Sequence, residues 1–102
     1  MMSDNVRHPE HYADHCSIEC IDMIRLVLGD EGFGKFCIGN AMKYLWRWRF
    51  KNGREDIEKA KVYADWLRDF VDRDFLSNMA CDLNIIIDMI EKAERQADEA
   101  DD

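Results

Sequence analysis

The chain has 102 residues, a length that allows one domain with a modest hydrophobic core. Hydrophobic residues make up 47% of it and there are one proline and five glycines, which excludes a disordered chain and disfavours a many-turned β architecture. The net charge of −8 excludes broad binding of duplex DNA, because that affinity comes mainly from neutralising phosphates.

The first predicted elements are an extended arm over residues 1–16 and a helix that follows it. Pro9 disfavours helix in the residue before it, and no apolar period is visible in the arm. Ser17 is a suitable N-cap. Ile18, Ile21, Ile24 and Leu28 then share one helix face, and Gly29 ends that helix.

Three further helices are predicted along the chain. The second begins within 31–36 and ends near Lys51, before the turn dipeptide Asn52-Gly53. The third begins near Arg54, and its core face is predicted to carry Ile57, Ala60, Ala64, Leu67 and Val71. The fourth runs from about Phe75 to Ala97, with an apolar seam at Leu76, Met79, Leu83, Ile86, Ile90 and Ala93, and a frayed acidic tail follows it.

These elements predict an all-α fold, a small bundle of three to four helices with an extended N-terminal arm and no sheet. The whole chain, 1–102, is expected to be a single domain: the arm 1–16, a helical core 17–72, and a C-terminal helix with an acidic tail over 73–102. The short core and the long apolar seam favour a homo-oligomer. No run of 18 apolar residues and no signal-peptide core is present, so we expect no membrane segment and a cytoplasmic location.

The stretch GDEGFGKF, residues 29–36, resembles the phosphate-binding loop G-x-x-x-x-G-K-[ST] in all but its last position. Phe36 replaces the hydroxyl residue that would bind Mg²⁺, and Asp30 and Glu31 would repel a triphosphate. The loop also needs a buried strand before it, whereas an amphipathic helix precedes this stretch. We therefore expect no P-loop, and interpret Gly29 and Gly34 as turn residues.

A better anion-binding candidate follows, on the second predicted helix. Between Lys35 and Arg54 there are six Lys or Arg residues and no acid. At helical spacing, Asn40, Lys43, Arg47 and Lys51 gather on one side, bordered by Tyr44. Lysine and arginine on one face can bind phosphate. The alternative is a solvated basic face that balances acids such as Glu55 and Asp56.

Three acids could hold a metal ion. Glu19 and Asp22 lie three apart on the first predicted helix, and Asp56 could join them from the third. Such carboxylates can bind Mg²⁺ through oxygen and water. The alternative is that these acids form structural salt bridges with Lys43, Arg47 or Lys59.

Four ordered blocks resemble a small phage-encoded nucleotide kinase-like family, over about residues 6–70. They are HPEHY (8–12), IECID (18–22), GNAMKYLWRWRFKNG (39–53) and EDIEKAKVY (55–63). The resemblance implies a nucleoside monophosphate kinase without a P-loop, acting in the cytoplasm of an infected bacterium, with a nucleoside triphosphate as phosphate donor. The motif positions that carry it are His8, Pro9, His11, Tyr12, Glu19, Asp22, Gly39, Asn40, Lys43, Tyr44, Arg47, Lys51, Gly53, Asp56, Lys59, Ala60 and Tyr63.

On this hypothesis the phosphates would contact Lys43, Arg47, Lys51 and Lys59. Asn40 and Tyr63 would contact the sugar or base. Tyr44, with His8 and Tyr12 from the arm, would also bind the nucleotide or its phosphates. The candidate catalytic residues are His11, which would close the site, and Glu19, Asp22 and Asp56, which would hold Mg²⁺ or orient the acceptor phosphate.

Two alternatives use the same basic face. One is a non-catalytic protein that binds and sequesters a nucleotide, and the other is an all-α, Mg²⁺-dependent nucleotide pyrophosphohydrolase. In each case the expected partners are nucleotides and further copies of the chain, not a specific nucleic acid sequence.

Overall fold

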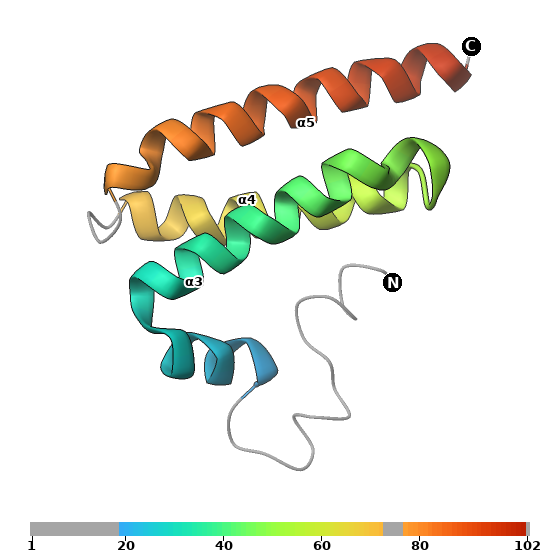
Figure 1. The fold of residues 1–102 in the computed structure, drawn as a ribbon. Coiled ribbons are helices and arrows are strands. Elements are labelled where there is room, and N and C mark those ends of the chain that lie inside the picture. Colours follow the sequence, from blue (N-terminus) through green and yellow to red (C-terminus); the bar gives the residue numbers. More distant parts are fainter. Residues whose placement is uncertain (1–18, 73–76, 102) are drawn as a thin grey trace.

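The structure is a computed structural model, and it describes residues 19–72 and 77–101. These residues are helical almost throughout and contain no strand, which confirms the all-α prediction. The predicted arm, residues 1–16, lies outside the described residues. In chain order the elements are α3 (Cys20–Arg47), the 3₁₀ turn η1 (Trp48–Phe50), α4 (Arg54–Asp72), the 3₁₀ turn η2 (Ser77–Met79) and α5 (Ala80–Asp101) (Figure 1).

The helix α3 consists of two helical segments that meet at a sharp bend (Figure 1). The bend is at Gly29, whose φ of 76° and ψ of 174° belong to a region that essentially only glycine adopts. The prediction that Gly29 separates two helices is confirmed. The prediction for Gly34 is wrong, because Gly34 lies inside the second segment and is buried. The stretch GDEGFGKF is therefore a bend followed by helix and forms no phosphate-binding loop.

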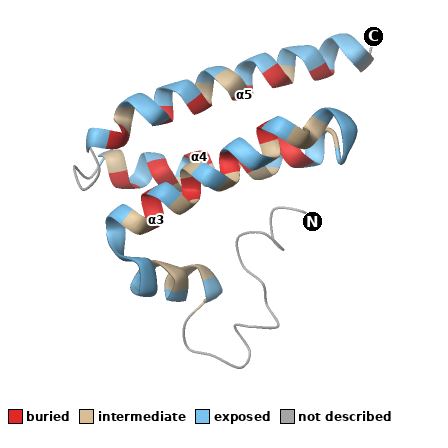
Figure 2. Cartoon of the chain, in the orientation of Figure 1, coloured by how far each residue is buried: buried red, intermediate tan, exposed pale blue. Residues whose placement is uncertain are grey.

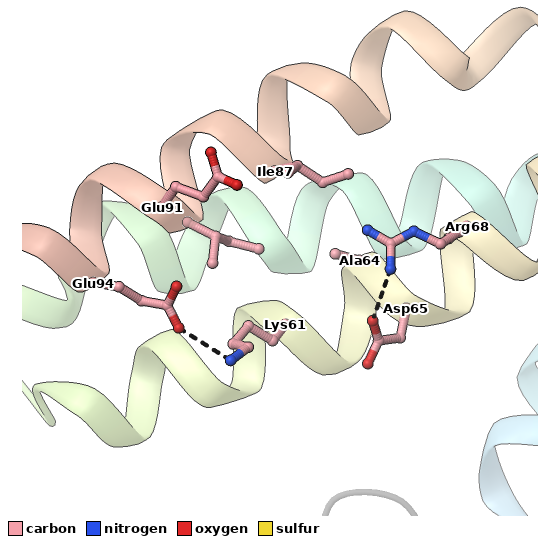
Figure 3. Close-up of a pocket in the computed structure, with 8 residues that line it drawn as sticks. Lys61, Ala64, Asp65, Arg68, Ile87, Glu91 and Glu94 are labelled. Carbon is pink, nitrogen blue, oxygen red and sulfur yellow. Dashed lines mark hydrogen bonds and ion pairs between the residues drawn. The ribbon is translucent and has the colours of Figure 1, made fainter.

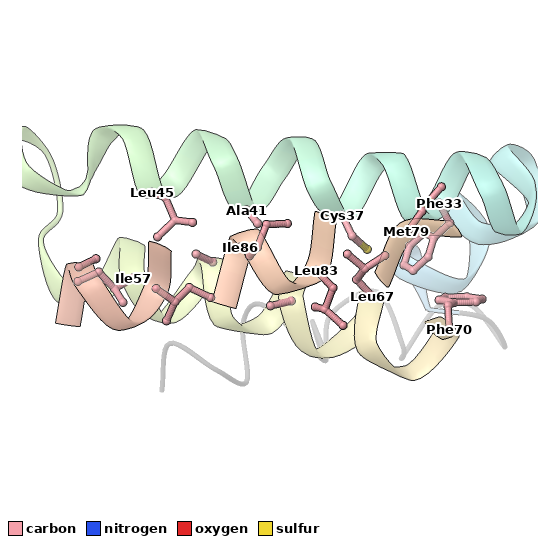
Figure 4. Packing of buried hydrophobic residues seen from close by; sticks show 14 of the residues in the cluster. Phe33, Cys37, Ala41, Leu45, Ile57, Leu67, Phe70, Met79, Leu83 and Ile86 are labelled. Atoms are coloured by element: carbon pink, nitrogen blue, oxygen red, sulfur yellow. The ribbon is translucent and has the colours of Figure 1, made fainter. Parts of the chain in front are cut away.

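The core lies where the three helices meet (Figures 2 and 4). Along η2 and α5, buried residues recur at alternating spacings of four and three: Met79, Leu83, Ile86, Ile90, Ala93 and Ala97. They pack against buried side chains of the other two helices: Phe33, Cys37, Ala41 and Leu45 on α3, and Ile57, Ala60, Ala64, Leu67 and Phe70 on α4. The predicted seam is confirmed from Met79 to Ala93, and it packs within the chain, whereas Leu76 lies outside the described residues.

The end of α5 differs from the prediction. The acidic residues predicted to fray are helical as far as Asp101. Two contacts from distant parts of the chain hold this end: Arg54 donates to Asp98 at 2.7 Å, and Arg49 donates to Gln96. A local pattern of acids could not reveal these partners, because they lie more than 40 residues away.

No described helix carries an apolar stretch long enough to cross a lipid bilayer.

Candidate functional site

Two helices bring the predicted basic residues to one place. Lys43, Tyr44 and Arg47 lie on consecutive turns of α3, and Lys59 and Tyr63 lie one turn apart on α4. Spacings of three and four residues keep each group on one side of its helix. Because α3 packs closely against α4, the two groups meet. The sequence predicted the members on each helix, and the structure adds that the two helices share one site.

Three cations surround the ring of Tyr44. The Nζ atom of Lys43 lies 4.5 Å from the ring centroid, the guanidinium carbon of Arg47 lies 4.9 Å away, and the Nζ atom of Lys59 lies 5.4 Å away. The ring of Tyr63 is stacked on that of Tyr44, with centroids 6.0 Å apart. An aromatic face attracts cations within about 6 Å, so it offsets part of the repulsion among three like charges.

Asp56 neutralises one of these cations. Its carboxylate is fully buried and accepts hydrogen bonds from Arg47 Nε at 3.2 Å and Nη2 at 3.4 Å. It also accepts from the backbone N and the side-chain Nδ2 of Asn52, each at 3.3 Å. Burial alone would raise the pKa of Asp56, but the hydrogen bonds from Arg47 and Asn52 and the charge of Arg47 lower the pKa overall. Asp56 is therefore an ionised structural partner that fixes the position of Arg47.

The two lysines differ from Arg47 in this respect. Within the described ranges, neither Lys43 nor Lys59 has a carboxylate oxygen within 4.0 Å of its Nζ atom. Lys43 instead donates to Asn40 Oδ1 at 3.2 Å, and Asn40 Nδ2 donates to the carbonyl of Phe36 at 2.9 Å. The site thus carries two lysine charges that no carboxylate of the described residues pairs within 4.0 Å.

We name the group Asn40, Lys43, Tyr44, Arg47, Lys59 and Tyr63 the Tyr44 site.

The three carboxylates predicted to hold Mg²⁺ form no common cluster among the described residues. Glu19 is the N-cap residue of α3, and Asp22 in its first turn lies 4.0 Å from Arg25. Asp56 uses its carboxylate for Arg47 and Asn52, which matches the alternative interpretation of this acid as a salt-bridge partner. In the part of the chain that the structure describes, no group of three or more His, Cys, Asp or Glu residues could hold a metal ion.

Of the remaining predicted residues, the structure describes one. Lys51 is exposed, in the turn between η1 and α4. The arm residues His8, His11 and Tyr12 fall outside the described residues, so their roles stay predictions.

Sequence reasoning missed a row of aromatic rings that continues from Tyr63. The ring centroid of Phe36 lies 5.8 Å from that of Tyr63, and the ring centroid of Trp66 lies 5.3 Å from that of Tyr63. Burial raises the pKa of the Tyr63 phenol, so its hydroxyl keeps its proton and can donate a hydrogen bond at neutral pH. Phe33 extends the row, with its ring centroid 6.4 Å from that of Trp66 and 5.4 Å from that of Phe70. The guanidinium of Arg25 lies 4.7 Å from the ring centroid of Phe70. The spacing of three and four between Tyr63, Trp66 and Phe70 is the signal that could have revealed this row.

A second polar groove lies between α4 and α5 (Figure 3). It has a volume of about 190 Å³, and four of its charged groups form two pairs: Lys61 Nζ lies 3.0 Å from Glu94, and Arg68 lies 3.7 Å from Asp65. Glu91 is a further acid in the lining. The hydrogen bond to Glu94 raises the pKa of Lys61, so this lysine stays charged and paired with Glu94. Compensated charges make this groove a poorer anion site than the Tyr44 site.

Comparison with known proteins gives a family without an assigned activity. The sequence profile of DUF3310, described as a protein of unknown function, matches residues 6–65. The Gene 1.7 protein of Enterobacteria phage T3 is 29% identical over 72 residues, which cover 63% of this chain and 42% of that protein. The match thus spans less than half the length of this relative, whose phage source supports a phage origin for the chain. No solved structure matches.

These findings overturn the resemblance to a nucleotide kinase-like family. The four ordered blocks lie largely within the matched residues, but the matched family is one of unknown function, and the name of the phage T3 relative states no activity. Since the family profile covers more than half of the sequence, the chain belongs to the DUF3310 family.

Proposed function

We propose that this chain binds a nucleotide through its phosphate groups at the Tyr44 site. The observation that carries the proposal is the gathering of three cations from two helices around one ring, with no carboxylate near two of them in the described ranges. In a chain of net charge −8, such a local positive site favours a small, strongly charged anion over an extended polyanion. A phosphate group has that chemistry.

The two lysines are the proposed phosphate ligands. Lys43 and Lys59 each present an ammonium group, which binds a phosphate oxygen as a point charge. Arg47 contributes less directly, because its Nε and Nη2 atoms already donate to Asp56. Since Asp56 balances its charge, the net positive charge of the site comes from the two lysines.

The surroundings of the lysines favour a nucleotide over free phosphate. The rings of Tyr44 and Tyr63 offer aromatic surface beside the cations, and stacking a base on such a ring contributes about 1–3 kcal/mol. The hydroxyl of Tyr63 and the amide of Asn40 offer polar contacts to a sugar or base. Inorganic phosphate has no base that could stack on these rings.

Isothermal titration calorimetry with deoxynucleoside mono- and triphosphates tests the proposal. Each lysine that contacts a phosphate contributes about 1.5 kcal/mol or more, so a Lys43→Ala/Lys59→Ala variant should bind at least about 100-fold more weakly. The matched control, Lys35→Ala/Lys92→Ala, removes the same charge from exposed positions outside the site and should stay within about threefold of the parent. Equal losses in both variants, or no binding by the parent protein, would refute the proposed site.

A second candidate function is the nucleoside monophosphate kinase activity expected from the sequence. Phosphoryl transfer depends mainly on positioning and positive charge around the moving group, and the three cations at Tyr44 favour it. Binding without turnover is the better supported function, since the expected carboxylate set is not gathered in the described part of the chain.

Recovery of the ligand separates these functions. After incubation with a labelled nucleoside triphosphate, Mg²⁺ and a monophosphate acceptor, a sequestering protein returns both nucleotides unchanged. A kinase moves the label to the acceptor, and a pyrophosphohydrolase releases pyrophosphate.

A further inference from the structure

A second surface, formed by α3, η1 and α5, is apolar and exposed. It consists of Met42 and Trp46 on α3, Phe50 at the end of η1, and Ile85 and Met89 on α5, and we name it the Trp46 face. Trp46 is 73% exposed and Phe50 is 65% exposed. Their rings pack edge to face on each other, with centroids 4.9 Å apart, while both stand outside the core.

A hollow adjoins these protruding rings. Its volume is about 490 Å³, and its lining consists of Met42, Leu45, Trp46, Arg49, Phe50 and Met89. One face therefore carries both a projecting indole and an apolar recess of the kind that could receive one. A surface that holds a projection beside a recess can pair with an identical copy about a two-fold axis, because each copy then supplies both partners.

We propose that two copies of this chain associate through the Trp46 face, with Trp46 of each copy seated in the hollow of the other. This proposal is independent of the nucleotide site.

The distribution of charge permits a second copy as the occupant. A chain of net charge −8 repels its own copies over most of its surface. The lining of the hollow, however, contains one cation, Arg49, and no acid. The acids Glu91 and Glu94 lie in the groove between α4 and α5, not in this hollow. Two copies can therefore approach at the Trp46 face without bringing lining carboxylates together.

The same charge argues against a lipid surface as the occupant. Tryptophan and phenylalanine side chains can enter a membrane interface, but anionic lipid would repel a protein of this net charge. Only one cation lines the hollow to offset that repulsion.

The size of the face fits a protein interface. If a wholly exposed aromatic side chain offers about 200 Å², Trp46 and Phe50 together expose on the order of 300 Å². Met42 and Ile85, which are also exposed, raise the apolar area to about 500 Å². A standard interface buries about 800 Å² on each partner, and this area includes a polar rim. The apolar area of the Trp46 face is therefore large enough to form the centre of such an interface.

Sedimentation equilibrium of the full chain over a range of concentrations tests the inference. The parent protein should show a species of twice the 12.1 kDa chain mass. Trp46→Glu places a charge at the centre of the interface and should weaken dimerisation at least about 30-fold, the loss typical of a central aromatic anchor. Ile85→Glu repeats the test from α5. The control, Leu26→Glu, changes an equally exposed apolar residue outside the face and should leave the dimer intact.

Circular dichroism of each variant checks that the helices are retained. We expect them to be retained, because the substituted residues are exposed and lie outside the core. A parent protein that stays monomeric at every concentration would overturn the inference, and would do so whether the face is covered by another part of the chain or by a different protein. A dimer that survives both Trp46→Glu and Ile85→Glu would overturn it as well, because the copies would then meet elsewhere.

Discussion

Replacing Asp56 by Asn tests the role that the structure gives to this acid. Asp56 is fully buried, and four donor contacts converge on its carboxylate: two from Arg47 and two from Asn52. Asparagine has nearly the same shape but no charge, and its NH₂ group would face donors instead of accepting from them. The substitution therefore leaves Arg47, whose side chain is only 23% exposed, without its counter-charge.

The expected loss of stability follows from this burial. Breaking a buried ion pair by removing one partner costs about 3–5 kcal/mol. Because Arg47 retains some contact with water, we expect the lower end, about 3 kcal/mol. The matched control is Asp98→Asn, which breaks the ion pair with Arg54 at a carboxylate that is 72% exposed. An exposed pair contributes little, so this variant should lie within about 0.5 kcal/mol of the parent.

Acidification should reduce the difference between parent and Asp56→Asn. The native pKa of Asp56 is lowered, so its stabilising contribution is complete above the ordinary aspartate pKa of about 4. That contribution is lost as the pH falls through the lowered native pKa. The two proteins should therefore differ most near neutral pH and converge in strong acid.

Urea unfolding followed by circular dichroism, at pH 7 and at a series of lower pH values, provides the measurement. An Asp56→Asn variant as stable as Asp98→Asn at pH 7 would refute the reasoning. A difference that grew on acidification would refute the assignment of Asp56 as the ionised partner.

Two further predictions concern backbone geometry and thiol reactivity. Gly29→Ala should destabilise the fold by about 2 kcal/mol in urea unfolding, since Gly29 has a φ of 76°. Gly39 lies inside α3 with nothing within 4 Å of an added Cβ, so Gly39→Ala should instead stabilise the fold by about 0.5–1 kcal/mol. A Gly29→Ala variant more stable than Gly39→Ala would contradict the bend. Burial raises the pKa of Cys37 to about 12, so Cys37 should react slowly with an alkylating agent. Timed alkylation at pH 8 followed by mass spectrometry should label the exposed Cys20 and Cys81 first. Equally fast labelling of Cys37 would contradict its burial.

The helices could be predicted where the spacing of residues within one helix indicated them. The spacing of Met79, Leu83, Ile86 and Ile90 predicted the seam of α5, because alternating gaps of four and three residues place side chains on one helix face. Gly34 was misread because glycine normally favours a turn. Its cost in a helix, about 1 kcal/mol, is smaller than the gain from burying a neighbour such as Phe33.

The sequence could predict which residues belong to the candidate site, but not which of them contact one another. Spacing identified Lys43 and Arg47 as neighbours, but two predicted partners of Mg²⁺, Glu19 and Asp22, do not join Asp56. The buried carboxylate of Asp56 binds Arg47 across two helices, and helical periodicity does not report contacts between helices. The family resemblance carried an activity label that the comparisons do not support: an ordered set of motifs identifies a family, and the matched family has no assigned function.

A structure of the chain with a bound deoxynucleotide is the most direct test of the proposed function. We expect phosphate oxygens within about 3 Å of the Nζ atoms of Lys43 and Lys59, beside the ring of Tyr44. A nucleotide whose phosphates lie instead in the groove of Lys61 and Arg68, or point away from both lysines, would contradict the account.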